Sequence, residues 1–197
     1  MQNFTYLSAG STYMKRQPYA LSGIVGPVIA LFFIALSIAL SPWFSWSSNA
    51  LSDLGHSVKS DVAPLYNFGL LLAGLFLVIY SVTTFTSGAK YTSCCLFISA
   101  LSLQLIATFD EVYGSFHTVV SSLFFVSLGF ASIIYAVERR SILAAAAFAI
   151  GFGSWAFYYA RVYITGIAVP EIVSSVATAS WIVLSALGTY LGKYSEN

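Results

Sequence analysis

Long apolar stretches dominate the chain, and short polar segments separate them. The stretches run over Tyr19–Leu40, Pro64–Phe85, Tyr91–Phe109, His117–Val137, Ile142–Ala160 and Val169–Leu191. Each is close to the roughly 20 residues of helix that cross a bilayer core. The runs are unbroken and do not alternate with polar residues, which favours helices over the strands of a membrane barrel. The pattern predicts an all-α integral membrane protein, a bundle of six transmembrane helices.

The same pattern divides the chain into segments. Residues 1–18 form a polar N-terminal segment, residues 19–191 one transmembrane domain, and residues 192–197 a short polar tail. The first 17 residues lack the apolar core of a cleavable signal peptide. The first apolar stretch is therefore expected to remain as an uncleaved anchor.

The composition excludes several classes of protein. Hydrophobic residues make up 58% of the 197 residues, charged residues only 8%, and mean hydropathy is +0.84. Soluble domains carry about 25% charged residues, so a soluble enzyme and a disordered chain are excluded. The net charge is +1 with no basic block or nucleotide motif, so no nucleic-acid or nucleotide partner is expected. Adjacent Cys94 and Cys95 have no metal-ligand or disulfide spacing and are interpreted as packing residues.

The basic residues are distributed unequally between the two sets of loops. Only Lys59 and Arg161 lie on one side, whereas six basic residues lie on the other, namely Lys15, Arg16, Lys90, Arg139, Arg140 and Lys193. The positive-inside rule places the larger set in the cytoplasm. We therefore expect a multi-pass protein of the cell membrane with both termini cytoplasmic and three loops facing outward, over Ser41–Ala63, Asp110–Phe116 and Arg161–Ala168.

Chemically active side chains gather in these outer loops. Both histidines, His56 and His117, and five of the seven acids lie there, the acids being Asp53, Asp61, Asp110, Glu111 and Glu171. Ionisable groups near a membrane are costly unless they serve a site or pair with each other. The sequence therefore predicts that any functional site lies at the outer boundary of the membrane.

The first outer loop is the longest and is expected to contain a short interfacial helix. Ser48 suits the start of that helix and Gly55 its end. Leu51 and Leu54 would then face the bundle, leaving a polar flank of Asn49, Ser52, Asp53 and His56. The alternative is a capped surface helix whose polar groups are solvated.

The second outer loop is a tight hairpin that brings Asp110 or Glu111 within reach of His117. Below it, two polar stripes are predicted to descend into the bundle. One consists of Gln104, Thr108 and Glu111, and the other of His117 and Ser121. Hydrogen bonds that merely join the helices would explain the hydroxyls and the amide equally well.

The third outer loop leads into the last helix through Pro170 and Glu171. An acid there favours the helix dipole, but Glu171, Ser174, Ser175 and Thr178 also share one face and could line a cavity. Arg161 either snorkels to the interface or serves as a counter-ion to a lipid phosphate or to Glu171. Asn67 is expected to point into the bundle and to meet Asp53 and His117 there.

Four short motifs in order along the chain resemble those of an uncharacterised prokaryotic membrane family, domain-of-unknown-function family 998 (DUF998). They are Asn49-Ala50-Leu51-Ser52-Asp53-Leu54-Gly55, Pro64-Leu65-Tyr66-Asn67-Phe68-Gly69, Phe116-His117-Thr118 with Phe124-Phe125, and Ala168-Val169-Pro170-Glu171. The resemblance covers Tyr19 to Leu191 and implies a six-helix fold within the wider Frag1/DRAM/Sfk1-like group, some members of which are tied to membrane-lipid organisation. The resemblance implies no reaction. The candidate site residues that its motifs imply are Asn49, Ser52, Asp53, Asn67, His117 and Glu171.

Two function classes follow. The first is a binding protein whose outer polar site holds a lipid headgroup, a small ligand or a partner subunit. Its expected ligand-binding residues are Asn49, Ser52, Asp53, Asn67, Asp110, Glu111, His117 and Glu171. The alternative is a lipid-modifying hydrolase of the outer leaflet. The sequence therefore leaves open whether the protein is an enzyme. No nucleophile-elbow or zinc-protease motif supports the hydrolase.

The hydrolase hypothesis takes two forms. In the metal-free form, Asp53 and His117 act as an acid–base pair, with Glu171 as a further catalytic candidate. In the other form, zinc is held by His56, His117 and one carboxylate. A transporter is less well supported, because the acids stop near the outer boundary and do not continue through the midplane.

Overall fold

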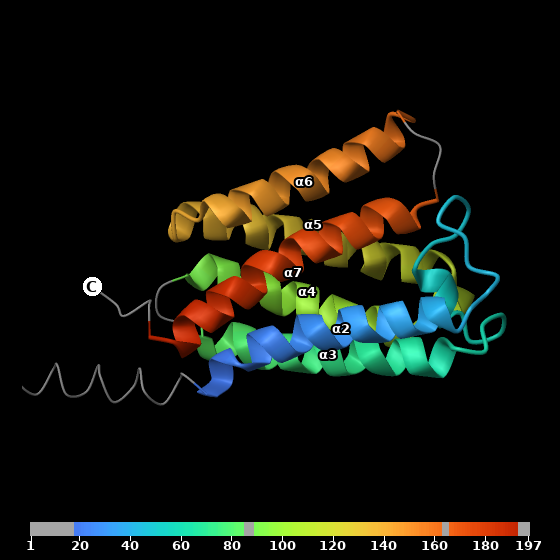
Figure 1. The fold of residues 1–197 in the computed structure, drawn as a ribbon, viewed down its shortest axis with the longest axis horizontal. Coiled ribbons are helices and arrows are strands. Elements are labelled where there is room, and N and C mark those ends of the chain that lie inside the picture. Colours follow the sequence, from blue (N-terminus) through green and yellow to red (C-terminus); the bar gives the residue numbers. More distant parts are fainter. Residues whose placement is uncertain (1–17, 85–88, 163–165, 193–197) are drawn as a thin grey trace, which may run out of the picture.

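A computed structural model describes residues 18–84, 89–162 and 166–192 (Figure 1). Within this part of the chain, the helices are α2 (Ser22–Ala39), α3 (Ala63–Thr84), α4 (Lys90–Thr108), α5 (Ser115–Glu138), α6 (Ile142–Tyr159) and α7 (Ala168–Tyr190). Two short 3₁₀ turns, η1 (Ser52–Gly55) and η2 (Glu111–Tyr113), lie in the loops. The predicted N-terminal segment and tail, with Lys15, Arg16 and Lys193, fall almost wholly outside the described residues.

The expected all-α fold is confirmed. Six helices are long and apolar enough to cross a membrane, from Pro18–Ala39 through Ala168–Tyr190. Their ends differ from the predicted ones by one or two residues; the fourth, for example, begins at Ser115 and not at His117. The spans are predictable because a backbone in lipid must satisfy all its hydrogen bonds within the helix, which requires a continuous apolar run.

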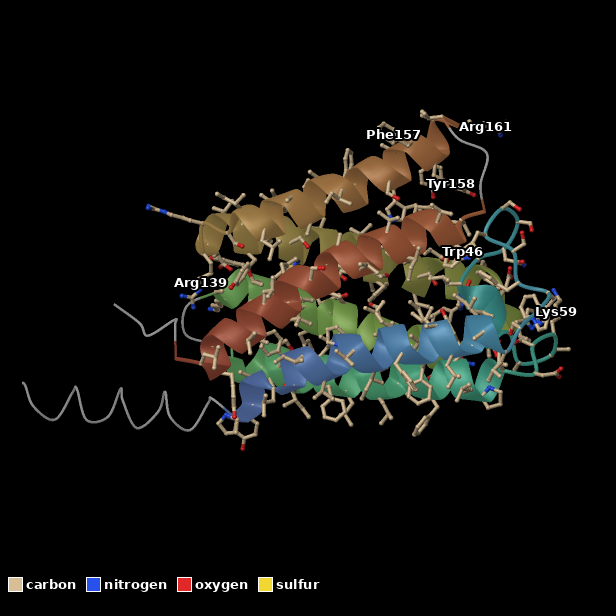
Figure 2. All side chains as sticks on the ribbon, in the orientation of Figure 1. Trp46, Lys59, Arg139, Phe157, Tyr158 and Arg161 are labelled. Carbon is tan, nitrogen blue, oxygen red and sulfur yellow. The ribbon has the colours of Figure 1, made fainter. Side chains whose placement is uncertain are left out.

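The six helices form a ring in which successive helices pack side by side and α7 closes onto α2 (Figure 1). The first loop, η1, η2 and the α6–α7 connection all lie at one end of this ring. We call it the loop end, made up of residues 40–62, 109–114, 160–162 and 166–167. Figure 2 shows Trp46 and Lys59 at the loop end and Arg139 at the opposite end.

Helix α6 diverges from the rest of the bundle towards the loop end (Figure 1). It packs along α7 through small buried residues, Ala144, Ala147, Gly151 and Ser154. By contrast, the backbones of α5 and α7 come close at few positions, and side-chain contacts of Ser132 and Tyr135 with Trp181 and Ser185 join the two helices. An open space lies between α5, α6 and α7.

The first loop differs from its predicted form. The expected helix from Ser48 is replaced by turns and by the 3₁₀ turn η1, which begins at Ser52. Asn49 and Asp53 account for the difference, because their side chains hydrogen-bond to the backbone of Ser45 and Ala50 and so compete with helix formation.

The inward-facing leucines of this loop are as predicted. Leu51 is 4% exposed and Leu54 is fully buried. They dock the loop onto the bundle as part of its hydrophobic core.

Candidate functional site

Backbone contacts fasten the first loop to the start of α7. The amide of Gly166 donates to the Trp46 carbonyl at 2.9 Å, and the amide of Ala168 donates to the Asn49 carbonyl at 3.1 Å. Gly166 allows this approach, because a Cβ there would lie 2.5 Å from the Asn49 carbonyl oxygen. Two loops far apart in sequence thus form one layer over the end of the bundle.

Asn49 and Asp53 stabilise the shape of the loop. The Asn49 Nδ2 group donates to Asp53 Oδ2 at 2.7 Å, and the Ala50 amide donates to the same oxygen at 2.9 Å. The Asn49 Oδ1 atom accepts from the Ser45 amide at 2.9 Å. The described side-chain hydrogen bonds of Asn49, a predicted site residue, therefore lie within its own loop.

Three consecutive loop residues bring three carboxyl groups together. The Leu51 amide donates to Glu171 Oε2 at 2.7 Å. The Ser52 hydroxyl donates to Glu111 Oε1 at 2.6 Å, and Glu111 also hydrogen-bonds with the carboxyl group of Asp53. We call Asp53, Glu111 and Glu171 the carboxyl cluster. It joins the first loop, η2 and α7.

A shared proton explains how Asp53 and Glu111 lie side by side. Burial raises the pKa of Glu111, and the neighbouring Asp53 carboxylate raises it further. Burial acts in the same direction on Asp53, but hydrogen bonds from Asn49, Glu111 and the Ala50 amide bring its pKa below the ordinary value. Asp53 therefore ionises at a lower pH than Glu111, and in the singly protonated pair the proton resides on Glu111.

Asp110 and His56 lie beside this cluster and have structural partners. Asp110 caps η2 by accepting from the Val112 amide at 2.9 Å, and it accepts from the Ser57 amide at 3.1 Å. His56 Nδ1 accepts from the Val58 amide at 3.3 Å. Asp110 thus joins the second loop to the first, whereas the bond of His56 lies within the first loop.

Asn67 and His117 point inward, as predicted, but they do not meet Asp53. The Asn67 Nδ2 group donates to the Gly55 carbonyl at 2.9 Å. His117 Nδ1 bonds to the Phe109 carbonyl at 2.8 Å, and His117 Nε2 faces the Ser121 hydroxyl at 3.3 Å. Since no hydrogen bond among the described residues joins the three, each anchors a different part of the loop end.

The predicted stripe on the third span also differs. Thr108 is exposed, and its hydroxyl donates to the Gln104 carbonyl within the helix. The Gln104 side chain packs where Gly74 of α3 leaves room. Because the helix ends at Thr108, Glu111 in η2 no longer follows the helical spacing that would align it with these residues.

Two cavities meet at Glu171. The inner cavity, of about 90 Å³, lies inside the ring and is almost wholly apolar. The lateral groove, of about 540 Å³, lies between α5, α6 and α7. The residues that line both are Ser121, Phe125, Leu128, Glu171 and Thr178. The predicted polar face of the last helix does line cavities, with Ser174 in the groove and Ser175 in the inner cavity.

Sequence reasoning missed a second polar layer deeper in the bundle. The Ser185 hydroxyl of α7 bonds to Tyr135 of α5 at 2.9 Å and to Tyr80 of α3 at 3.1 Å. One turn away, the Trp181 indole donates to Ser132 at 2.9 Å and stacks on Tyr135. The signal was the continuation of the polar face of α7 at seven-residue steps, from Glu171 through Thr178 to Ser185.

The opposite end also holds a carboxylate with a clear partner. Glu138 accepts from the amides of Tyr91 and Thr92, each at 3.1 Å, and from the Thr92 hydroxyl. It therefore caps the start of α4, where a negative charge complements the helix dipole. Glu138 thus joins α4 to α5, and it lines neither of the two cavities that meet at Glu171.

The described residues include no group of three or more His, Cys, Asp or Glu side chains that could hold a metal ion. His56 and His117 have separate hydrogen-bond partners, so the zinc hypothesis gains no support from their arrangement. Cys94 and Cys95 are free thiols on α4.

Comparisons with known proteins identify a family and no activity. A family model described as "Protein of unknown function (DUF998)" matches residues 24–188. No curated protein and no solved structure matches the chain. The matched segment includes most of the first span, all of the next four, nearly all of the last, and the whole carboxyl cluster. The chain therefore belongs to the DUF998 family, a family of membrane proteins of unknown function.

Proposed function

We propose that this protein binds a membrane lipid in the lateral groove, with the lipid headgroup at Glu171 and the acyl chain between α5, α6 and α7. The observation that carries the proposal is the groove itself, an apolar opening of about 540 Å³ with one buried acid near its loop end. Ligand sites usually measure roughly 300–1,000 Å³, so the groove is large enough for part of a lipid.

The rim of the groove supports a lipid rather than a water-soluble ligand. Val126, Phe130 and Phe152 line it and are each more than half exposed. In a bilayer these side chains face acyl chains, so a lipid enters sideways from the membrane without crossing water. The groove walls towards the opposite end are apolar, as in Phe148, and suit a hydrocarbon chain.

The cost of a buried acid in a membrane supports a functional polar end. Glu171 is 8% exposed and begins a span, where ionisable residues usually mark a binding site or a pathway. A purely structural residue at this position would need only the bond to the Leu51 amide, which a glutamine could also make. We therefore attribute the presence of a carboxyl group, instead of an amide, to ligand binding.

Blocking the groove tests the proposal. A Cβ on Gly129, which lines the groove, would have only the Phe148 ring within 4 Å, at 3.9 Å, so Gly129→Leu would project into the open space. Gly153 lies on α6 outside the groove, and a Cβ there meets nothing within 4 Å, which makes Gly153→Leu the matched control. Native mass spectrometry of the detergent-purified protein should show retained lipid in wild type and Gly153→Leu.

Gly129→Leu should lose this lipid while melting at a similar temperature. Equal lipid retention by Gly129→Leu and the control would contradict the proposal. So would the absence of retained lipid from wild type after reconstitution with excess phospholipid.

The hydrolase hypothesis keeps one supporting observation. The Phe109 carbonyl can only accept, so His117 Nδ1 carries the proton and Nε2 is free to accept from Ser121. A histidine in this tautomer can activate a serine, and Ser121 lines both cavities. Ser121 would then be the nucleophile and His117 its general base, in place of the predicted pair of Asp53 and His117.

A fluorophosphonate probe separates the two functions. If the protein is a serine hydrolase, the probe should label Ser121, and labelling should vanish in Ser121→Ala and His117→Gln. If the protein only binds lipid, neither the wild type nor a Ser122→Ala control should be labelled. Binding without turnover is the proposal we favour, because the sequence contains no nucleophile-elbow motif around Ser121.

A further inference from the structure

Glu171 has one carboxylate oxygen that no described hydrogen bond uses. Its Oε2 atom accepts from the Leu51 amide at 2.7 Å, whereas Oε1 has no protein donor among the described contacts. The side chain lines both the lateral groove and the inner cavity. A carboxylate oxygen without a protein donor, on a side chain that lines two cavities, favours a ligand that donates hydrogen bonds.

The charges around Glu171 are acidic. Those that act on it come from Glu111 and Asp53, and no basic group contributes. Lys59 acts on Asp53 but lies on the exposed side of the first loop. The described part of the loop end therefore presents excess negative charge to the cavities, which a cationic group would neutralise.

Thr178 provides a second, independent indication of a ligand. It lies two helical turns below Glu171 on the same face of α7, is 5% exposed, and lines both cavities. No hydrogen bond among the described residues involves its hydroxyl, although buried hydroxyls are normally partnered. Ser174, between the two, already donates to the Pro170 carbonyl.

We propose that the lateral groove selects a phospholipid whose headgroup carries a primary amine. The ammonium group donates hydrogen bonds to Glu171 Oε1, and polar atoms nearer the acyl chain lie at the Thr178 hydroxyl. A quaternary ammonium has no N–H to donate, and an anionic headgroup is repelled by the carboxyl cluster. This inference rests on the lipid-binding function proposed above and specifies its ligand.

The phosphate distinguishes a phospholipid from a simple alkylamine. Tyr159 lines the groove, and Arg161 follows it at the end of α6 with its side chain exposed (Figure 2). Arg161 is two residues beyond the groove-lining Tyr159, so a zwitterionic headgroup with its amine at Glu171 would have its phosphate attracted towards that end of α6.

Competition between headgroups tests the inference. The full-length protein is exchanged into equal amounts of phosphatidylethanolamine, phosphatidylcholine and phosphatidylglycerol with identical acyl chains, and adducts are counted by native mass spectrometry. Charge-assisted hydrogen bonds predict a preference for phosphatidylethanolamine of roughly tenfold or more. Glu171→Gln keeps an oxygen for the Leu51 amide, so it should fold and bind lipid, but with the preference reduced to about twofold or less.

Two further variants complete the test. Thr178→Val has the same shape without the hydroxyl and should weaken binding of all three lipids similarly. Asp61→Asn removes one negative charge from an exposed position of the same end and should leave the preference intact. Lipid binding without a headgroup preference, or a preference that survives Glu171→Gln, would overturn this inference and leave the groove proposal standing.

Two other outcomes are equally decisive. A long-chain alkylamine that displaces lipid as well as phosphatidylethanolamine does would overturn the assignment to a phospholipid. If no lipid binds and Gly129→Leu changes nothing, the groove proposal itself fails, and this inference fails with it.

Discussion

Gly166 is the position where a single methyl group should open the loop end. A Cβ there would lie 2.5 Å from the Asn49 carbonyl oxygen, 2.9 Å from the Asn49 amide and 3.0 Å from the Ser48 amide. All three are backbone atoms, which cannot rotate away as a flexible side chain would. Overpacking of this kind costs about 1–3 kcal/mol, and here the upper part of that range applies.

The expected effect of Gly166→Ala is local rather than global. The loop can relieve the clash only by giving up the bonds from Gly166 to Trp46 and from Ala168 to Asn49, each worth about 1 kcal/mol. We therefore expect the docked loop to lose about 3 kcal/mol relative to the opened one. At about 1.4 kcal/mol per factor of ten, the open population rises roughly 100-fold.

Hydrogen exchange measures this opening directly. The Leu51 amide is protected by Glu171 and the Ala168 amide by Asn49, so both should exchange about 100-fold faster in Gly166→Ala. Amides in the middle of α3 and α4 should keep their wild-type rates. Gly153→Ala is the control, because a Cβ there meets nothing and removing a helical glycine is neutral or slightly stabilising. Unchanged exchange at Leu51 in Gly166→Ala would refute the docking of the first loop onto α7.

Three further outcomes follow from the loop end. Because the pKa of Asp53 lies below and that of Glu111 above its ordinary value, stability should rise as Asp53 ionises and then fall as the pH passes from the ordinary to the raised pKa of Glu111. Glu111→Gln should make this fall in melting temperature smaller and leave the rise at acid pH in place. Asn67→Leu leaves the Gly55 carbonyl without its donor and should cost about 1–3 kcal/mol in thermal unfolding, whereas an unchanged melting temperature would show that the bond is dispensable. The charge bias also predicts the topology, which single cysteines test in a background lacking the two native ones. A cysteine at Asp61 or Tyr113 should react with an impermeant thiol reagent added outside cells, whereas one at Lys90 or Arg140 should react only from inside.

The spans could be read from the sequence because lipid imposes one rule on every residue of a helix. Tyr19–Leu40 or Ile142–Ala160 cannot be anything but helical if they cross a bilayer. The burial of Leu51 and Leu54 was also predictable, since their three-residue spacing places both on one side of a short helical turn. These features depend on local sequence and on the solvent.

The partners of the polar residues could not be read in the same way. Acids gathering at one end were predicted, but the contact between Leu51 and Glu171 joins residues 120 positions apart and depends on how two loops cross at Gly166. The start of η1 was misplaced because the competing hydrogen bonds of Asn49 and Asp53 depend on the final loop shape. That Thr178 could line a cavity was predicted from the face it shares with Glu171, but which helices enclose the groove is visible only in the fold.

The central claim is that a lipid occupies the groove between α5, α6 and α7. A phosphatidylethanolamine analogue with a photoactivatable diazirine in its acyl chain tests it most directly, followed by mapping of the cross-linked peptides. The account predicts cross-links concentrated on groove residues such as Phe130, Phe148 and Thr178, and their loss in Gly129→Leu. Cross-links spread evenly over outward-facing positions such as Val28 and Phe32 of α2, and unchanged by Gly129→Leu, would contradict it.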